Sequence, residues 1–330
     1  MSPSLFLTGA TGFLGSNLLH HLEGRGLDLW AGVRGAVPEH QGEVRWVPYD
    51  PVEQLTFGPE TTLVHLAARA HKMRDLAPDP RAEFFSANCD FTLALAQRAK
   101  DQGAKRFVFI SSVKVMGDRP GFYRLGDPPA PEEPYGESKW AAEQGLQKIF
   151  GPGSQTECVI LRLPMVYGPG AKGNVLTLLK AAKRGLALPL AGATQARSML
   201  FVGNFLSALD RILATPVDLT QPVKTYFLTD GKDLTSGAFY AQLAARFSKR
   251  KALFLVPKVL LTLAALAGEG LGKVAGRPLP LNFAVLSRLF EEYRFDPSAF
   301  ATDFRWTAPF TPEQGLLETA QWYHDLTLET

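Results

Sequence analysis

The sequence has few cysteines and no long uninterrupted apolar run. Cys89 and Cys158 are its two cysteines among 330 residues, which excludes a disulfide framework and the cysteine spacing of a metal site. Charged residues make up 20% of the chain and the net charge is +3, too small and too dispersed for a nucleic-acid surface. The N-terminus lacks the charged and apolar regions of a signal peptide. We therefore expect a cytoplasmic protein that binds no nucleic acid and no metal.

The most apolar segment, ALFLVPKVLLTLAALAG, covers residues 252–268. Pro257 and Lys258 interrupt it, and the remaining run is shorter than the ~20 apolar residues that span a bilayer. The segment therefore predicts a buried or interfacial helix and no firm membrane association. Peripheral contact with a membrane stays open.

The first half of the chain alternates β-rich runs with helical patterns. The expected strands cover residues 4–9, 27–34, 43–49, 62–68, 106–112 and 157–163, and the expected helices cover 13–26 and 83–103 and begin again at 135. Near-continuous apolar strands that alternate with helices are typical of a parallel sheet covered on both faces. The predicted fold class is therefore α/β, a doubly wound parallel sheet.

The alternation loosens after about Pro169. The pattern there predicts helices at 175–184, 204–214 and 237–250 and strands near 199–202 and 225–231. We expect a dinucleotide-binding Rossmann domain over residues 1–168. Residues 169–330 are expected to form a smaller, mostly helical substrate-binding lobe, with some strand and helix returning to the first domain.

Three glycines, Gly9, Gly12 and Gly15, lie between the first strand and the first helix. In dinucleotide-binding turns the first glycine permits the tight turn, the second lets the backbone approach a pyrophosphate, and the third allows close helix–strand packing. The helix N-terminus also offers unpaired N–H groups and a partial positive charge. The turn therefore predicts a phosphate cradle that includes Thr11, Phe13 and Leu14.

Arg34 stands at the end of the second strand, where NAD-binding proteins usually carry an acidic residue. A guanidinium suits the 2′-phosphate of NADP, so Arg34 favours NADP over NAD; the alternative is an exposed loop arginine. Asp50 ends the third strand. It is either a partner for the adenine amine or a turn-forming aspartate before Pro51.

Tyr135 and Lys139 are four residues apart in a predicted helix and therefore share a face. A neighbouring ammonium favours the phenolate, so we expect it to lower the pKa of Tyr135. The tyrosine is then suited to take a proton from an alcohol or return one to a ketone. Ser111 and Ser112 end a strand at the edge where such sheets bind ligands, and a serine there can polarise the substrate oxygen.

These segments together resemble the extended short-chain dehydrogenases/reductases of the NAD(P)-dependent epimerase/dehydratase type. The motifs that carry the resemblance are TGATGFLG, VHLAA, SANCDFT, FISSVKVMG, PYGESK and LRLPMVYGPG. The resemblance implies Ser112, Tyr135 and Lys139 as the catalytic set, with Ser112 preferred over Ser111 for its spacing to Gly117. Asn88 matches a family asparagine, with a catalytic and a structural interpretation both open. The implied further cofactor contacts are Leu66, Ala67, Ala68, Leu163 and Val166, besides Tyr135 and Lys139.

The nearest subgroup comprises bacterial 4-epimerases and 4-keto-reductases of UDP-sugars. Its pattern implies Asn174 and Arg197 as contacts of the nucleotide diphosphate and Lys114 as a further substrate contact. An NADP-dependent reductase of a steroid- or flavonoid-like ketone is the alternative, and a non-catalytic dinucleotide-binding module is a third. The family also implies a homodimer formed through the helices at 83–100 and 136–150.

Overall fold

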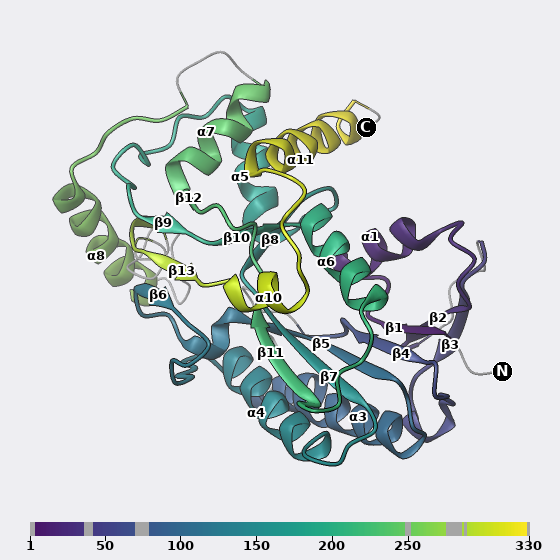
Figure 1. The fold of residues 1–330 in the computed structure, drawn as a ribbon. Coiled ribbons are helices and arrows are strands. Elements are labelled where there is room, and N and C mark those ends of the chain that lie inside the picture. Colours follow the sequence, from purple (N-terminus) through teal and green to yellow (C-terminus); the bar gives the residue numbers. More distant parts are fainter. Residues whose placement is uncertain are drawn as a thin grey trace.

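A parallel sheet of seven strands forms the centre of the molecule (Figure 1). The computed structural model describes residues 4–35, 42–69, 79–247, 252–274, 286 and 289–328. The strand order is β3-β2-β1-β4-β5-β7-β11. The strands are β1 Leu5–Thr8, β2 Leu29–Val33, β3 Arg45–Pro48, β4 Thr62–His65, β5 Arg106–Ser112, β7 Glu157–Leu163 and β11 Val223–Phe227. The order reverses between β1 and β4, which opens a ligand-binding crevice at the carboxyl ends of these strands. The predicted doubly wound sheet is confirmed.

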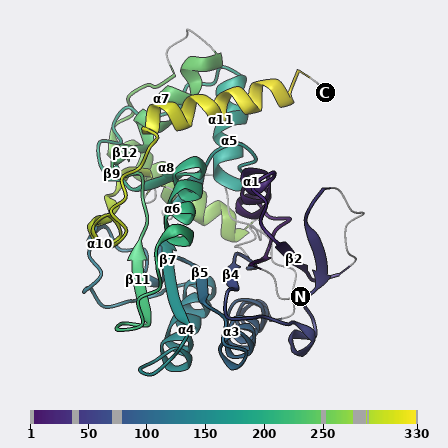
Figure 2. The ribbon, with the colours of Figure 1, turned by 45° about the vertical axis from the view of Figure 1, so that its right-hand side comes forward.

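Helices cover both faces of this sheet, as Figure 2 shows. One face carries α1 Phe13–Leu22 and α6 Val202–Ala214, and the other carries α2 Pro80–Phe85, a π-helical turn Ser86–Asp90, α3 Phe91–Asp101 and α4 Pro134–Ile149. Two separate buried apolar clusters result, one on each side of the sheet. Burial on both faces explains why the central strands are apolar at nearly every position.

The helix predicted over residues 83–103 contains a break that the periodicity did not reveal. The turn Ser86–Asp90 is π-helical, so it holds one more residue than an α-helical turn. Within it, the Asn88 amide accepts from the Arg69 backbone N–H at 2.7 Å and donates to the Arg69 carbonyl at 3.1 Å. These tertiary bonds compensate for the disturbed helix.

Short strands lie outside the central sheet, and the sequence patterns did not predict most of them. They are β6 Gly121–Tyr123, β8 Met165–Tyr167, β9 Ala196–Arg197, β10 Met199–Phe201, β12 Leu234–Thr235 and β13 Tyr293–Phe295, of which only β10 was expected. They form a two-stranded sheet, β10-β8, and a four-stranded sheet, β12-β9-β13-β6. Strands of two or three residues are too short for an alternating pattern to identify them.

The remaining helices of the described residues surround these small sheets. They are α5 Gly173–Lys183, α7 Ser236–Phe247, α8 Lys258–Val274, α10 Ser298–Asp303 and α11 Pro312–Leu326, with 3₁₀ turns at Val52–Gln54 and Val113–Met116. The predicted end of α7, residues 248–250, lies outside the described residues. No helix in the described ranges is long and apolar enough to cross a membrane. Although α6 and β11 follow residue 169, both pack on the central sheet, and the domain division stays a prediction.

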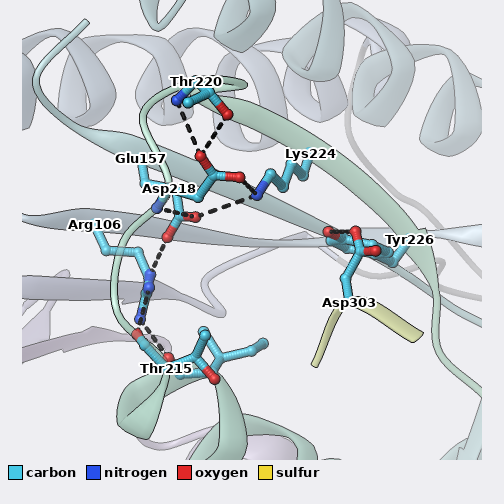
Figure 3. Close-up of polar contacts among 9 residues, drawn as sticks. Arg106, Glu157, Thr215, Asp218, Thr220, Lys224, Tyr226 and Asp303 are labelled. Carbon is cyan, nitrogen blue, oxygen red and sulfur yellow. Dashed lines mark hydrogen bonds and ion pairs between the residues drawn. The ribbon is translucent and has the colours of Figure 1, made fainter. Parts of the chain in front are cut away.

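A buried ion pair connects the amino-terminal ends of β5 and β7 to α6 (Figure 3). Arg106 of β5 donates to the Glu157 carboxylate of β7, and the two side chains are 1% and 3% exposed. The guanidinium also donates to the carbonyls of Ile212 and Thr215, at the last turn of α6. A cation at this end is favoured by the helix dipole, so one arginine connects two strands and a helix.

Removing one partner of this pair is expected to destabilise the fold strongly. Glu157→Gln leaves the Arg106 charge buried without its counter-ion, which costs about 3–5 kcal/mol of unfolding free energy. Urea unfolding measures the loss. Asp218→Asn is the matched control, because Asp218 pairs with Lys224 in the same cluster but is exposed, and its loss should change stability little. Equal effects of the two substitutions would contradict this account.

Candidate active site

The glycine turn between β1 and α1 has no room for a side chain at Gly9 or Gly15. Gly9 has φ of +73°, and a Cβ there would lie 2.6 Å from the Ala67 backbone nitrogen. A Cβ on Gly15 would lie 2.2 Å from the Gly9 carbonyl oxygen. Gly12 caps α1 without any side-chain hydrogen bond, so the first N–H groups of the helix remain available to an anion. Thr11 at the turn is exposed, while Phe13 and Leu14 are half-buried.

The other predicted cofactor residues lie at the carboxyl ends of the strands. Arg34 directly follows β2 and is exposed, and Asp50 is exposed after β3. Leu66, Ala67 and Ala68 follow β4, Leu163 ends β7, and Val166 belongs to β8. Because parallel strands end at one edge of a sheet, most of this set borders the crevice. Their contacts with a dinucleotide remain a prediction.

Ser112 and Tyr135 meet at the end of β5. The Ser112 hydroxyl accepts from the Lys114 backbone N–H at 3.2 Å, and it lies close enough to the Tyr135 phenol to lower the pKa of that group. Ser111 points the other way and donates to the Glu143 carboxylate at 2.5 Å. The two adjacent serines therefore have different surroundings.

Lys139 lies one turn after Tyr135 on α4 and is buried. Its Nζ donates to the Ile110 carbonyl at 2.9 Å and stands 4.5 Å from the centroid of the Phe109 ring. Burial lowers the pKa of Lys139 to about 7, and the Glu143 carboxylate opposes that shift. The amine therefore changes protonation near neutral pH, which an exposed lysine does not.

The prediction that the pKa of Tyr135 is lowered is wrong for this structure. Burial raises the pKa of Tyr135, and the hydrogen bond from Ser112 acts in the opposite direction. The ammonium of Lys139 is engaged with the Ile110 carbonyl and the Phe109 ring instead. Desolvation of the phenolate is therefore the larger effect at Tyr135, and Ser112 is the group that offsets it.

Sequence reasoning missed a buried ion pair behind Lys139. Glu143 lies one turn after Lys139 on α4 and pairs with Arg162 of β7, Nη2 to Oε2 at 2.7 Å, with exposures of 0% and 5%. Ser111 completes the carboxylate's hydrogen bonds. The i, i+4 spacing of Tyr135, Lys139 and Glu143 is visible in the sequence. The partner on β7 is not, because it lies on another element.

A second buried network joins the ends of β1 and β4 to the π-helical turn. Thr8 Oγ1 lies 2.6 Å from His65 Nδ1, and His65 Nε2 lies 2.9 Å from Thr92 Oγ1. Thr92 donates to the Asn88 carbonyl and Thr8 accepts from the Ala67 N–H, so His65 donates through Nε2 and accepts at Nδ1. Burial lowers the pKa of His65 to about 3. This neutral histidine supports the backbone beneath the crevice.

Asn88 contacts the active-site helix through Ser138. Its amide donates to Ser138 Oγ at 3.1 Å, and that hydroxyl donates to the Tyr135 carbonyl at 2.9 Å. Together with its two bonds to Arg69, these contacts support the structural interpretation of Asn88. A catalytic role for Asn88 remains a prediction.

The three predicted substrate contacts lie apart along the chain. Lys114 is half-buried and pairs with Asp118 and, at 3.9 Å, with Glu133. Asn174 is exposed in the first turn of α5. Arg197 of β9 donates to the Glu291 carbonyl at 3.0 Å and lies over the Tyr293 ring. Their roles toward a substrate stay predictions. No cluster of residues able to hold a metal ion occurs in the part of the chain that the structure describes.

Comparison with known proteins agrees with this fold. Residues 5–225 match the NAD dependent epimerase/dehydratase family. A UDP-glucose 4-epimerase of Vibrio cholerae is 32% identical over 330 residues, 97% of this chain and 95% of that protein. N-acetyl-alpha-D-glucosaminyl-diphospho-ditrans,octacis-undecaprenol 4-epimerase of Escherichia coli O157:H7 is 25% identical, with 98% and 96% covered. The solved structure of MoeE5 in complex with UDP-glucuronic acid and NAD has a TM-score of 0.71 at 21% identity, covering 98% of this chain and 99% of that one.

The chain belongs to the NAD dependent epimerase/dehydratase family. It is an enzyme of the extended short-chain dehydrogenase/reductase type, and the resemblance inferred from its motifs is confirmed.

The lowered pKa of Lys139 predicts an unusual pH dependence of stability. The pKa of Lys139 is about 7 in the folded state, against 10.5 for a free lysine. Below pH 7 the buried charge therefore lowers the free energy of unfolding by a constant amount. This loss of stability becomes smaller as the pH rises from 7 toward 10. Lys139→Met should therefore be more stable than the native protein at pH 6, by up to several kcal/mol, and no more stable than it near pH 10.

Urea unfolding at the two pH values tests this expectation. Lys148→Met is the control, since Lys148 is exposed on the same helix and should give no pH-dependent difference. A gain from Lys139→Met that is the same at pH 6 and pH 10 would show that the amine keeps an ordinary pKa.

Proposed function

We propose that the enzyme transfers a hydride at C4 of a UDP-sugar and acts as a UDP-sugar 4-epimerase. The observation that carries the proposal is the proximity of the Ser112 hydroxyl to the Tyr135 phenol, one helical turn from a buried Lys139, at the carboxyl edge of the sheet. Similarity to the Vibrio cholerae UDP-glucose 4-epimerase over nearly the whole chain supports this reaction over the others of the family.

A nicotinamide dinucleotide fits the residues at the glycine turn. Gly9 and Gly15 have no side chains that would block an approach to the backbone, and α1 begins with N–H groups that no side chain caps. Both features suit the binding of a pyrophosphate. When bound, the dinucleotide supplies the hydride acceptor and donor for C4. Lys139 is the residue that we expect to bind its ribose hydroxyls. The exposed Arg34 favours NADP, whereas the NAD in the MoeE5 complex favours NAD; native mass spectrometry of the purified protein distinguishes the two.

The residues of the crevice provide a path for the C4 hydroxyl proton. Ser112 orients and polarises the C4 oxygen, and Tyr135 takes its proton while the C4–H bond breaks. The Ser112 hydroxyl also stabilises the resulting phenolate, which burial alone disfavours. The C4 ketone that forms accepts the proton from Tyr135 again in the reverse step. When the hydride returns to C4 from the opposite face of the sugar, the product is the C4 epimer.

The diphosphate of the substrate is assigned to the lobe around α5 and β9. Arg197 carries a planar guanidinium suited to two phosphate oxygens, and Asn174 stands at the first turn of α5. Both relatives described above are named for sugars attached to a diphosphate, in UDP-glucose and in a diphospho-undecaprenol. This shared chemistry supports a diphosphate site in the present enzyme.

Substitution at the two neighbouring serines separates catalysis from folding. Ser112→Ala should lower kcat for interconversion of UDP-glucose and UDP-galactose about 10²–10³-fold, because the polarising hydroxyl is lost, with little change in melting temperature. Ser111→Ala should instead lower stability by about 1–3 kcal/mol, since the buried Glu143 carboxylate loses a donor, and should leave most of kcat. The opposite pattern would contradict the assignment of Ser112.

Tyr135→Phe tests the reaction itself. The variant should lose at least about 10²-fold in kcat, which is the scale of general acid–base catalysis, while it still binds the dinucleotide. The loss is measured by coupled assay of UDP-sugar epimerisation, with NADPH oxidation by a UDP-4-keto-hexose assayed in parallel. Turnover retained by Tyr135→Phe would overturn the mechanism, and turnover only in the second assay would make the enzyme a 4-keto-reductase.

A further inference from the structure

Helix α8, Lys258–Val274, is apolar on two opposite faces. Leu261 and Ala265 are buried in the core of the substrate lobe, together with side chains of α5 and α7. The opposite face carries Val259, Leu260, Leu263 and Leu266, which are 69%, 56%, 56% and 51% exposed. A helix that is hydrophobic all round is normally buried or in contact with lipid. Within the part of the chain that the structure describes, one face of α8 therefore lacks the covering that its composition requires.

The exposed apolar surface continues into the segment before the helix. Phe254 and Leu255 are 44% and 70% exposed. Backbone bonds hold this segment to the lobe. The Leu188 N–H donates to the Ala252 carbonyl, the Phe254 N–H to the Leu188 carbonyl and the Ala191 N–H to the Phe254 carbonyl. These six side chains, Phe254, Leu255, Val259, Leu260, Leu263 and Leu266, are here called the α8 apolar face. Contiguous apolar patches of this kind mark interaction sites.

The charge of the surrounding sequence indicates what binds there. Residues 249–277 contain six basic residues and one acidic residue. The basic residues are Lys249, Arg250, Lys251, Lys258, Lys273 and Arg277, and the acidic one is Glu269. The described part of the lobe adds Lys183 and Arg184, exposed at the end of α5 just before the 48%-exposed Leu186. An apolar helix face accompanied by basic residues is typical of helices that lie in the interface of an anionic bilayer.

Two other occupants fit these observations less well. A second copy of the chain in a twofold arrangement would bring the same basic segment against itself, and like charges would oppose that contact. The helices expected to form a dimer, α3 and α4, lie on the far face of the central sheet, well away from α8 (Figure 1). Insertion across a membrane is excluded for the described helices by their length and composition.

We propose that the α8 apolar face docks reversibly on the surface of an anionic phospholipid bilayer. The helix lies in the plane of the surface, with Leu263 and Leu266 directed to the acyl chains and Leu261 and Ala265 still packed on the lobe. Leu255 also approaches Gly192 in the loop that precedes β9, so docking brings the side of the lobe that carries Arg197 close to the headgroups. The inference rests on the helix and its charge, and does not depend on which sugar the enzyme uses.

Vesicle flotation of the full chain tests the proposal. At about 100 mM salt, the native protein should float with phosphatidylcholine–phosphatidylglycerol vesicles and much less with phosphatidylcholine alone. Leu263→Gln with Leu266→Gln should weaken binding at least about tenfold, because two leucines no longer leave water. Leu317→Gln is the matched control, since Leu317 is 54% exposed on α11, and should float like the native protein.

Thermal unfolding and sedimentation velocity complete the test. The native protein, the double variant and Leu317→Gln should melt at similar temperatures, because the altered side chains are exposed. The proposal is overturned if the native protein floats with neither type of vesicle, or if the double variant floats as well as the native protein. It is equally overturned if the native protein is an oligomer that the double substitution dissociates, since the face would then join copies of the chain. Epimerase assays of Tyr135→Phe remain a separate test of the reaction.

Discussion

The burial of one amine constrains the rest of this active site. Lys139 lies on α4 against β5, where the Ile110 carbonyl and the Phe109 ring receive its Nζ. That position lowers its pKa to about 7 and fixes the helix so that Tyr135 meets Ser112 at the strand end. A buried ammonium costs stability, and the fold offsets that cost with the carboxylate of Glu143, itself neutralised by Arg162. Function and stability therefore oppose each other at the same side chain.

A few buried polar networks hold the strands and helices around the active site in place. Arg106 and Glu157 fasten β5 and β7 to the end of α6, while the neutral His65 connects the ends of β1 and β4 with the π-helical turn. Each network satisfies its buried groups with partners from different elements, as a dry interior requires. The glycine turn, the serine and the tyrosine consequently share one edge of the sheet. The second lobe, with α5, β9 and α8, is built above that edge (Figure 1).

Much of the fold could be predicted from the sequence because it depends on local patterns. Apolar runs identified β5 and β7 to the residue, and the glycines located the turn before α1. Features that depend on distant partners could not be found in this way. The π-helical turn is compensated by Arg69, the Glu143–Arg162 pair joins two elements, and β9 and β13 pair across about a hundred residues of chain. The expected acidity of Tyr135 failed for a related reason, since desolvation depends on packing that spacing does not reveal.

The protonation of Lys139 is the most direct test of this account. Nuclear magnetic resonance with ¹³C-labelled lysine follows each ε-carbon as pH changes, and comparison with Lys139→Met assigns the resonance of interest. The account predicts one lysine that titrates near pH 7 in the folded native protein, absent from the variant, while the exposed lysines titrate near pH 10. A Lys139 resonance that titrates with the others near pH 10 would contradict the central claim.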